Sequence, residues 1–373
     1  MRWYLISAAI FIQLFFIMDF FHVFSRESDF FLLSVCILSI IVLLQAEYDI
    51  VTSSVLNSAT KSATIGIIFQ EGTNEFFMQN PIKQQFYKQR ADFVKDARLR
   101  DERLHMPDDV IVQHDIPYLN DGNPAHRLDI YRPARAARKT LPVIINVHGG
   151  GLLLGSKEFN RYFCARLCKL GYVIFSVEYR LIPDCQIYDQ FADVSAAICF
   201  IHDNLRTYNG NPQKIYGVAD SGGACLLTYV TAMSHSRKVA DAAHVTKPPV
   251  SFRALGLISG MFYTTRFDKI GLFLPDYLYG KHYRKLPFAP YTNPEHPDIV
   301  RALPPCFLVT SHNDYLKRYT TNYTHALSRY HIPHKLLCYP KNKKLTHAFS
   351  VFEPDLPESM ETITAMHRYF RRH

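Results

Sequence analysis

Two short glycine-containing motifs could together perform chemistry on an acyl carbonyl group. Residues 148–151 read His-Gly-Gly-Gly, and residues 219–223 read Ala-Asp-Ser-Gly-Gly. A glycine run directly after an apolar strand leaves backbone N–H groups free to face a developing negative charge. A serine between small residues, at a turn from a strand into a helix, can be held exposed for attack. The two motifs therefore predict an oxyanion hole and a nucleophile elbow.

Ser221 is the predicted nucleophile. A hydroxyl is a weak nucleophile, so it needs a base, a fixed geometry and a site for the negative charge that develops. A predicted strand over residues 214–218 leads into Ser221, and a predicted helix starts directly after it. The small residues Ala219 and Gly223 would let this turn pass close to neighbouring backbone. The alternative is an incidental serine in a glycine-rich turn.

The glycine run is the predicted oxyanion hole. Gly149 and Gly150 follow the end of an apolar strand, and we expect their N–H groups to point at a carbonyl oxygen. The N–H of Gly222, next to the nucleophile, would be a third donor. Loss of one such donor typically costs about 2.7–4 kcal/mol of transition-state stabilisation. We interpret His148 as a residue that shapes the loop rather than as the catalytic base.

A base and an orienting acid should follow Ser221 in the order Asp or Glu, then His. The chain contains 17 histidines, so position must decide between them. His347 falls in a loop after the last predicted strand, and Asp314 falls at the carboxyl end of the strand before it. Asp314 would accept from one imidazole nitrogen and fix the tautomer that takes the proton of Ser221. Candidates without this strand-end context are Asp298, Asp276 and Asp355 as the acid and His312 as the base.

The elements that must position these residues alternate between strands and helices. The run over residues 143–147 is apolar throughout, as in strands buried on both faces of a parallel sheet. Regular alternation predicts a mostly parallel, doubly wound α/β sheet. The predicted strands cover residues 110–112, 128–131, 143–147, 172–177, 214–218, 254–258, 305–310 and 334–339, and the predicted helices cover 158–170, 188–208, 222–234, 316–330 and 357–370.

Further motifs occur in a recognisable order along residues 108–360. In addition to the two glycine motifs, they read Glu-Tyr-Arg-Leu-Ile-Pro-Asp at 178–184, Leu-Pro-Pro at 303–305, Asp-Tyr-Leu at 314–316 and His-Ala-Phe at 347–349. With them the chain resembles an α/β-hydrolase of the hormone-sensitive-lipase-like esterases, a group that includes bacterial acetyl esterases and the arylacetamide deacetylases. Its motifs depart from the usual Gly-Asp-Ser-Ala-Gly-Gly, Asp-Pro-Leu and His-Gly-Phe, but each departure keeps the reacting group.

The resemblance implies several features of the catalytic domain. A lid would be built from about residues 60–107 and 261–300. Arg180 and Asp184 would lie on a loop that braces the glycine run, with Asp193 as a structural partner. A short acyl group, acetyl to about butyryl or hexanoyl, would be preferred, and neither a metal nor a cofactor is expected.

Composition narrows the class of protein. The net charge is +9, but the Lys and Arg residues are scattered and form no arginine-rich arm, so we expect no nucleic-acid partner. The charge is compatible with anionic membrane surfaces. The eight cysteines show no Cys-x-x-Cys pair and no zinc-site spacing, so reduced thiols are expected.

The N-terminal part has the composition of a membrane anchor. Residues 3–24 and 30–46 are two apolar runs separated by a short polar loop, and each is close to the length that spans a bilayer. We expect residues 1–50 to form a membrane-anchoring helical hairpin and residues 51–373 to form the hydrolase domain. Arg2 and Lys61 slightly outweigh Arg26 in the loop, which favours a cytoplasmic catalytic domain. The alternatives are a secretory signal in the first run and two core helices.

The function predicted from these residues is a membrane-anchored serine carboxylester hydrolase. It would cleave short-chain, acetyl-like esters through an acyl-enzyme intermediate. An amide hydrolase acting on N-acyl substrates would use the same residues and is the first alternative. A non-catalytic binding protein on the same fold is the second. The sequence does not indicate an oligomeric state.

Overall fold

The central feature of the fold is an eight-stranded sheet. The computed structural model describes residues 81–136 and 139–373. The strand order is β1-β2-β4-β3-β5-β6-β7-β8; β1 and β2 are antiparallel to their neighbours, and the other pairings are parallel. The strands are β1 (Val110–Pro117), β2 (Arg127–Pro133), β3 (Leu141–Val147), β4 (Val173–Val177), β5 (Gly210–Asp220), β6 (Leu255–Ile258), β7 (Cys306–Ser311) and β8 (His334–Tyr339). The predicted α/β class and mostly parallel sheet are confirmed.

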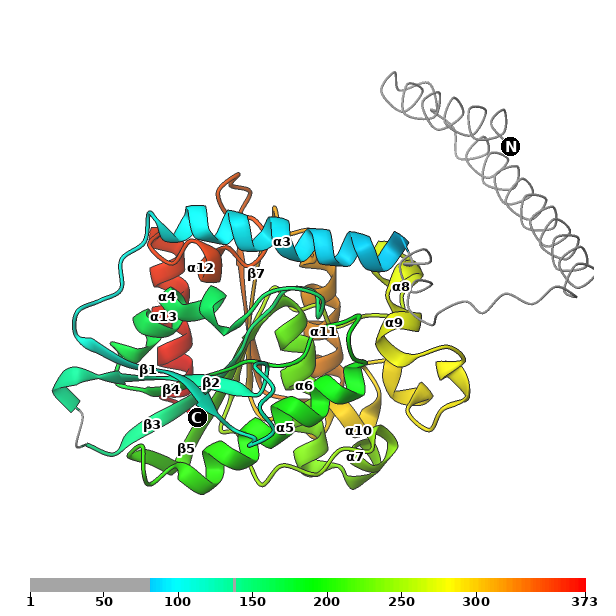
Figure 1. Ribbon diagram of the computed structural model, residues 1–373, viewed down its shortest axis with the longest axis horizontal. Helices are drawn as coiled ribbons and strands as arrows, with labels where there is room; N and C mark the ends of the chain where they lie inside the picture. Colours follow the sequence, from blue (N-terminus) through cyan, green and yellow to red (C-terminus); the bar gives the residue numbers. More distant parts are fainter. Residues whose placement is uncertain (1–80, 137–138) are drawn as a thin grey trace, which may run out of the picture. The chain divides into compact units, whose positions relative to one another are not determined.

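Helices cover both faces of this sheet, as the alternation of elements predicts (Figure 1). Strand residues alternate between two apolar cores: Val143 and Ile145 belong to one, and Ile144 belongs to the other. The first core includes residues of α5, α6 and α11, and the second includes residues of α4 and α13. These helices are α4 (Arg161–Cys168), α5 (Ile187–Asn204), α6 (Ser221–His235), α11 (Lys317–Arg329) and α13 (Pro357–Phe370), and the shorter α7 (Arg237–Ala243) and α12 (Phe349–Phe352) lie between them in the chain.

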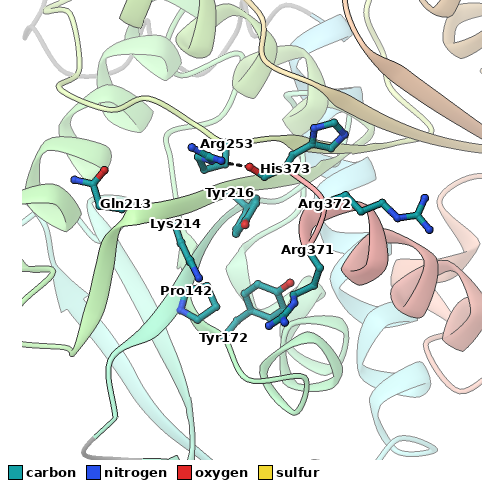
Figure 2. Close-up of a pocket in the computed structure, with 9 residues that line it drawn as sticks. All are labelled: Pro142, Tyr172, Gln213, Lys214, Tyr216, Arg253, Arg371, Arg372 and His373. Atoms are coloured by element: carbon teal, nitrogen blue, oxygen red, sulfur yellow. Dashed lines mark hydrogen bonds between the residues drawn. The ribbon is translucent and has the colours of Figure 1, made fainter.

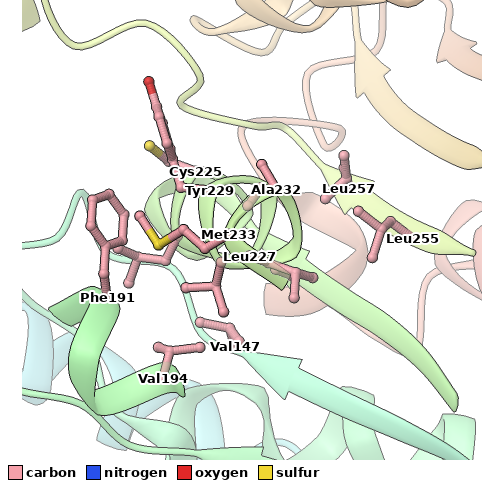
Figure 3. Close-up of a cluster of buried hydrophobic side chains, with 14 of the residues drawn as sticks. Val147, Phe191, Val194, Cys225, Leu227, Tyr229, Ala232, Met233, Leu255 and Leu257 are labelled. Atoms are coloured by element: carbon pink, nitrogen blue, oxygen red, sulfur yellow. The ribbon is translucent and has the colours of Figure 1, made fainter. Parts of the chain in front are cut away.

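Helix α6 is the central helix of the first core. Every residue from Ser221 to Ser234 is buried. Figure 3 shows Leu227 and Met233 of α6 facing Val147 of β3 and Val194 of α5. Burying one large apolar side chain contributes about 1.5–3 kcal/mol, so this packing fixes the helix firmly. The nucleophile candidate at its first residue therefore has a rigid support.

One predicted helix differs in detail from the expectation. Residues 158–170 were expected to form one helix, but the segment begins with a 3-10 turn (Lys157–Asn160) and continues as α4. The turn holds Lys157 and Asn160 in the buried interior, where both make polar contacts. Gly171 ends the segment with φ +93°, the left-handed conformation typical of a glycine that caps a helix.

One long helix lies over the end of the sheet where Ser221 is located. Helix α3 (Pro81–Asp101) runs across this end, above α12 and toward α8 and α9 (Figure 1). The ring of Phe86 contacts that of Tyr277 at 5.1 Å, and the ring of Phe93 stacks on Phe159 at 4.3 Å and contacts Phe352 at 6.1 Å. Helices α8 (Lys269–Phe273) and α9 (Pro275–Tyr279) lie at one end of α3 (Figure 1). The chain then continues through the 3-10 turns Tyr283–Lys285 and Ala289–Thr292 to α10 (Pro297–Val300), which packs against α6 and α7. A further 3-10 turn, Ala134–Ala136, follows β2.

Several predictions fall outside the described residues. They are the helical hairpin over residues 1–50, the start of the hydrolase domain at residue 51 and the part of the first lid segment before residue 81. Between residue 81 and the end of the chain, apart from residues 137–138, no helix combines the length and the apolar character needed to cross a bilayer.

Candidate active site

Ser221 lies at a sharp turn between β5 and α6. Strand β5 ends at Asp220, α6 begins at Ser221, and Ser221 has φ +48°. A side chain in this left-handed conformation is strained, as expected for a nucleophile elbow. A Cβ atom on Gly223 would lie 2.3 Å from the carbonyl oxygens of Val147 and His148, so only glycine fits there. The expected close approach of the turn to neighbouring backbone is confirmed at Gly223.

Three side chains from distant parts of the chain meet at this turn. His347 Nε2 lies 2.9 Å from Ser221 Oγ, and His347 Nδ1 lies 2.7 Å from Asp314 Oδ1. Asp314 follows β7, and His347 lies in the loop after β8. The carboxyl ends of β5, β7 and β8 lie at the same edge of the sheet because these strands are parallel. The structure thus brings the predicted nucleophile, base and acid together.

Asp314 is held in place by several donors. Its Oδ2 accepts from Thr310 Oγ1 at 2.9 Å, and its Oδ1 accepts from the amide of Leu316 at 2.9 Å. Burial raises the pKa of the Asp314 carboxyl, but the hydrogen bond and charge of His347, with the hydrogen bonds from Ser259 and Leu316, outweigh burial and hold the pKa below its usual value. The carboxylate therefore stays ionised at neutral pH, where it can orient the imidazole.

The structure corrects the prediction for Gly149. Its amide donates to Asp220 Oδ1 at 3.0 Å, inside the protein. Asn160 Nδ2 donates to the same oxygen at 2.8 Å. A Cβ atom on Gly149 would lie 2.1 Å from Asp220 Oδ2. Gly149 therefore packs closely against the nucleophile elbow. The N–H of Gly149 therefore does not face a substrate, because it is already hydrogen-bonded to the buried carboxyl group of Asp220.

Gly150, Gly151 and Gly222 remain close to the nucleophile. A Cβ atom on Gly222 would lie 2.8 Å from the amide nitrogen of Leu152 and 3.2 Å from that of Gly151. Gly150 has φ +115° and Gly151 has φ +62°. Within residues 81–136 and 139–373, neither of their amides donates a hydrogen bond to the protein. Gly222 is in the first turn of α6, where amides have no acceptor in the helix. Sequence reasoning missed Gly151, although the third glycine of the run was visible.

His148 shapes the loop, as expected. Its Nδ1 lies 2.7 Å from the carbonyl oxygen of Gly149, and its Nε2 lies 3.1 Å from Glu178 Oε1. Its ring is fully buried and stacks on Tyr179 with centroids 4.3 Å apart. The Tyr179 hydroxyl donates to the carbonyl oxygen of His148 at 2.8 Å, so the loop over residues 178–184 does contact the glycine run.

The other residues predicted to support the glycine run are Arg180, Asp184 and Asp193. Arg180 forms a bidentate ion pair with Asp193, with its Nη2 at 2.7 Å from Oδ1 and its Nε at 2.9 Å from Oδ2. Asp184 differs from expectation because its carboxylate binds α3: Tyr87 donates to it at 2.5 Å and Arg90 at 2.7 Å. Arg90 also donates to the carbonyl oxygen of Leu153 at 2.6 Å and to that of Ile182. It therefore joins α3 to the end of the glycine run.

The alternative acids and base have other partners. Asp355 pairs with Arg166, Asp298 accepts from Tyr291 at 3.3 Å, and His312 Nδ1 lies 3.5 Å from Lys317 Nζ. Asp276 lies on α9. Among the residues described, no group of three or more His, Cys, Asp or Glu side chains is arranged to hold a metal ion.

Comparisons with known sequences point to esterases. A family described as BD-FAE matches residues 128–254. A probable isoprenylcysteine alpha-carbonyl methylesterase of Oryza sativa subsp. japonica is 27% identical over 211 residues, which is 54% of this chain and 50% of the relative. Esterase LipQ of Mycobacterium tuberculosis is 34% identical over 30% of this chain and 27% of the relative. The chain thus spans half or less of the length of these relatives.

Comparisons with solved structures bear out the fold. Esterase B of Lactobacillus rhamnosis superimposes with a TM-score of 0.73 at 22% identity, covering 78% of this chain and 95% of the other. A bacterial heroin esterase superimposes with a TM-score of 0.60 at 21% identity, covering 76% of this chain and 91% of the other. At this level of identity the likeness establishes the three-dimensional arrangement.

Proposed function

We propose that this chain is a serine carboxylester hydrolase of the hormone-sensitive-lipase-like group of α/β-hydrolases. The observation that carries the proposal is the unbroken set of contacts from Asp314 through His347 to Ser221, at 2.7 and 2.9 Å. A nucleophile, a base within hydrogen-bond reach and a third group that orients the base are the parts that acyl transfer needs. Two relatives of this chain are named as esterases, which supports the same reaction class.

In the proposed reaction, Ser221 Oγ attacks the carbonyl carbon of the ester while His347 Nε2 takes the hydroxyl proton. The resulting tetrahedral intermediate collapses, the ester C–O bond breaks, and His347 gives its proton to the departing alcohol. A water molecule then attacks the acyl-enzyme, with His347 again acting as base, and the acid leaves with Ser221 restored. Asp314 keeps the imidazole in the tautomer whose Nε2 can accept the proton.

We assign the oxyanion hole to the amides of Gly150, Gly151 and Gly222. Gly150 and Gly222 follow the sequence-based prediction, and Gly151 replaces Gly149, whose amide is bonded to Asp220. The positive end of α6 adds to the field at this position, because the amides of its first turn are not bonded within the helix. Each preorganised donor is worth about 2.7–4 kcal/mol in the transition state.

A short acyl group remains our proposal for the substrate. Esterase B of Lactobacillus rhamnosis, similar in fold, was crystallised with a C4-C4 tributyrin phosphonate inhibitor. The plant relative is named as a methylesterase, so a small ester group on the alcohol side is a second possibility for the same site. An acyl-chain series of nitrophenyl esters, run beside a carboxyl methyl ester, separates the two. Highest kcat/KM for acetyl to hexanoyl esters is expected, and a maximum at decanoyl or longer would contradict this preference.

The reaction class is tested with a fluorophosphonate probe and a serine variant. Wild-type protein is expected to be labelled at Ser221 and to lose its ester hydrolysis on labelling. Ser221→Ala should reduce kcat by at least about 10³-fold, as removing a catalytic nucleophile does. The matched control is Ser251→Ala, which alters an exposed serine and should leave kcat unchanged. Unchanged turnover in Ser221→Ala, or no labelling of wild type, would contradict the proposal.

An amide hydrolase would use the same three residues. Turnover of matched acetate esters and acetanilides decides between the two classes. We expect the ester to be cleaved faster, and equal or faster cleavage of the acetanilide would assign the chain to amide hydrolysis. Labelling without turnover of either compound would favour a binding protein on this fold.

We also propose that α3 and residues 261–300 form the lid. The contacts of α3 with Leu153, Asp184 and Tyr277 support this proposal.

We further propose that residues 3–24 and 30–46 anchor the chain in a membrane, with its hydrolase domain on the cytoplasmic side. Carbonate extraction of the full chain, followed by protease treatment of intact membranes, tests this proposal. Release by carbonate would contradict anchoring, and digestion of the hydrolase domain from outside would contradict the orientation.

A further inference from the structure

A cationic hollow lies at the end of the sheet opposite Ser221. It has a volume of about 470 Å³ and is located where β3 and β5 begin, beside the end of α13. Ser221 follows the last residue of β5, whereas Lys214 is near the start of that strand. The hollow is therefore separate from the proposed active site. Its lining residues are Pro142, Tyr172, Gln213, Lys214, Tyr216, Arg253, Arg371, Arg372 and His373 (Figure 2).

Cations of the hollow come from three separate elements. Lys214 is on β5, Arg253 precedes β6, and Arg371 and Arg372 follow α13. Arginine at the end of a helix is common because it interacts favourably with the helix dipole, which accounts for Arg371 and Arg372. It does not account for Lys214 and Arg253, which are on strands or beside them. Convergence of cations from three elements is the feature that needs a further explanation.

None of these cations pairs with an Asp or Glu side chain in the part of the chain that is described, and no Asp or Glu there lines the hollow. By contrast, the buried Lys157 and the half-buried Arg180 each pair with a carboxylate. Like charges that converge in a concave site without Asp or Glu side chains raise the local positive potential and so attract anions.

Hydrogen bonds and a ring contact join the walls of the hollow. The hydroxyl of Tyr216 donates to the carbonyl oxygen of Phe370 at 3.0 Å, and its ring stacks on Phe370 with centroids 4.6 Å apart. Arg253 Nε donates to a main-chain oxygen of His373, the last residue of the chain, at 2.7 Å, and this contact is drawn as a dashed line in Figure 2. Among the described residues, the other two guanidinium nitrogens of Arg253 make no hydrogen bond to the protein. Arg371 lies beside Tyr172, whereas Arg372 extends outward (Figure 2).

We propose that this hollow binds a phosphate-bearing ligand through Lys214, Arg253 and Arg371. Guanidinium groups present paired N–H donors that match phosphate oxygens, and lysine adds a compact positive charge. A volume of about 470 Å³ is within the range of small-molecule sites and exceeds what one phosphate group fills. The ligand class is therefore an organic phosphate or diphosphate, either a free molecule or the headgroup of a lipid.

Two probes test the proposal and distinguish the sources. Pyrophosphate is titrated by calorimetry into the full chain, and vesicles of phosphatidylcholine with 20% phosphatidic acid (roughly the surface charge of an anionic leaflet) are used in a flotation assay. The test variant is Lys214→Gln/Arg371→Gln. The control Arg237→Gln/Lys238→Gln removes the same charge from exposed positions on α7. Circular dichroism and ester turnover, unchanged in both variants, establish that they are folded.

The expected result is binding that weakens at least about tenfold in the test variant and stays within about twofold in the control, since one charge-assisted hydrogen bond is worth about a factor of ten or more. Such a loss with pyrophosphate alone supports a soluble ligand, and a loss with vesicles alone supports a headgroup. No binding of either probe, or an equal loss in test and control variants, would overturn the proposal. Failure of ester hydrolysis with intact pyrophosphate binding would affect only the proposed enzymatic function.

Discussion

The backbone amide of Gly149 donates to Asp220 Oδ1 over 3.0 Å, and this bond joins the glycine run to the nucleophile elbow. Asp220 immediately precedes Ser221, so one buried carboxylate fixes the spacing between the proposed oxyanion donors and the proposed nucleophile. The same oxygen accepts from Asn160, and the other carboxylate oxygen has no partner among the described residues. The relationship makes Asp220 a positioning residue.

We predict that Asp220→Ala lowers kcat by about tenfold or more and costs about 1–3 kcal/mol of stability, because it leaves the Gly149 amide and Asn160 without an acceptor. Asp220→Asn keeps an acceptor oxygen and should restore most of kcat. The measurements are ester hydrolysis and urea denaturation. A kcat for Asp220→Ala equal to that of wild type would contradict the positioning role.

The Asp220→Asn variant also tests the ionisation of Asp220. Burial raises the pKa of this carboxyl, so its ionisation opposes folding. The protonated form contributes fully below about pH 4, near the pKa of an unfolded aspartate, and this contribution declines as pH rises through the folded pKa. Asp220→Asn should therefore be more stable relative to wild type at pH 8 than at pH 4. The opposite trend in denaturation midpoints would show that Asp220 is stabilised as an anion.

Asp314→Asn is predicted to lower kcat by about 10²–10⁴-fold with little change in KM, because an amide in this position favours the wrong imidazole tautomer. The pKa of Asp314 lies below its usual value, so the carboxylate stabilises the fold above about pH 4, and this contribution is lost as pH falls through the folded pKa. The stability gap between wild type and variant should thus shrink between pH 6 and pH 3. A constant gap would argue against the stabilising contacts of the Asp314 carboxylate.

Arg90→Met is predicted to loosen α3. It removes the donors to Leu153, Ile182 and Asp184, and we expect a faster cleavage of α3 by trypsin or chymotrypsin and a change of about tenfold in kcat/KM. Arg98→Met is the control, since it alters an exposed arginine of the same helix. Equal protection of α3 in Arg90→Met and in wild type would contradict the role of Arg90 in holding α3 in place.

Lys157→Met is predicted to destabilise the protein by about 3–5 kcal/mol, because it removes the buried lysine from the buried Asp129 carboxylate and leaves the exposed His114 and the Asp115 amide as its partners. Lys157 Nζ lies 3.0 Å from both Asp129 and Asp115, whereas the half-exposed Lys169 is 3.4 Å from Asp109. Lys169→Met should cost less than about 1 kcal/mol. The free energy of unfolding in urea compares the two, and a loss of similar size in both variants would contradict the prediction.

The sequence by itself determined the parts of this protein that depend on local patterns. Apolar runs of strand length, alternating with helices, predict the parallel sheet because the strands are buried on both faces. The turn from strand 214–218 into the helix at Gly222 and the strand-end positions of Asp314 and His347 are also local features. They identified the three side chains that the structure brings within hydrogen-bond distance.

Only the tertiary structure decided which glycine amides face the site. Gly149, Gly150 and Gly151 are chemically alike, and the direction of the Gly149 amide depends on Asp220, which no local pattern connects to it and which Asn160 also contacts. The contact of Asp184 with α3 and the convergence of cations from three elements in the distal hollow are decided in the same way. Such contacts depend on how segments far apart in the chain pack together. The periodicity and the residue spacing of the sequence carry no information about this packing.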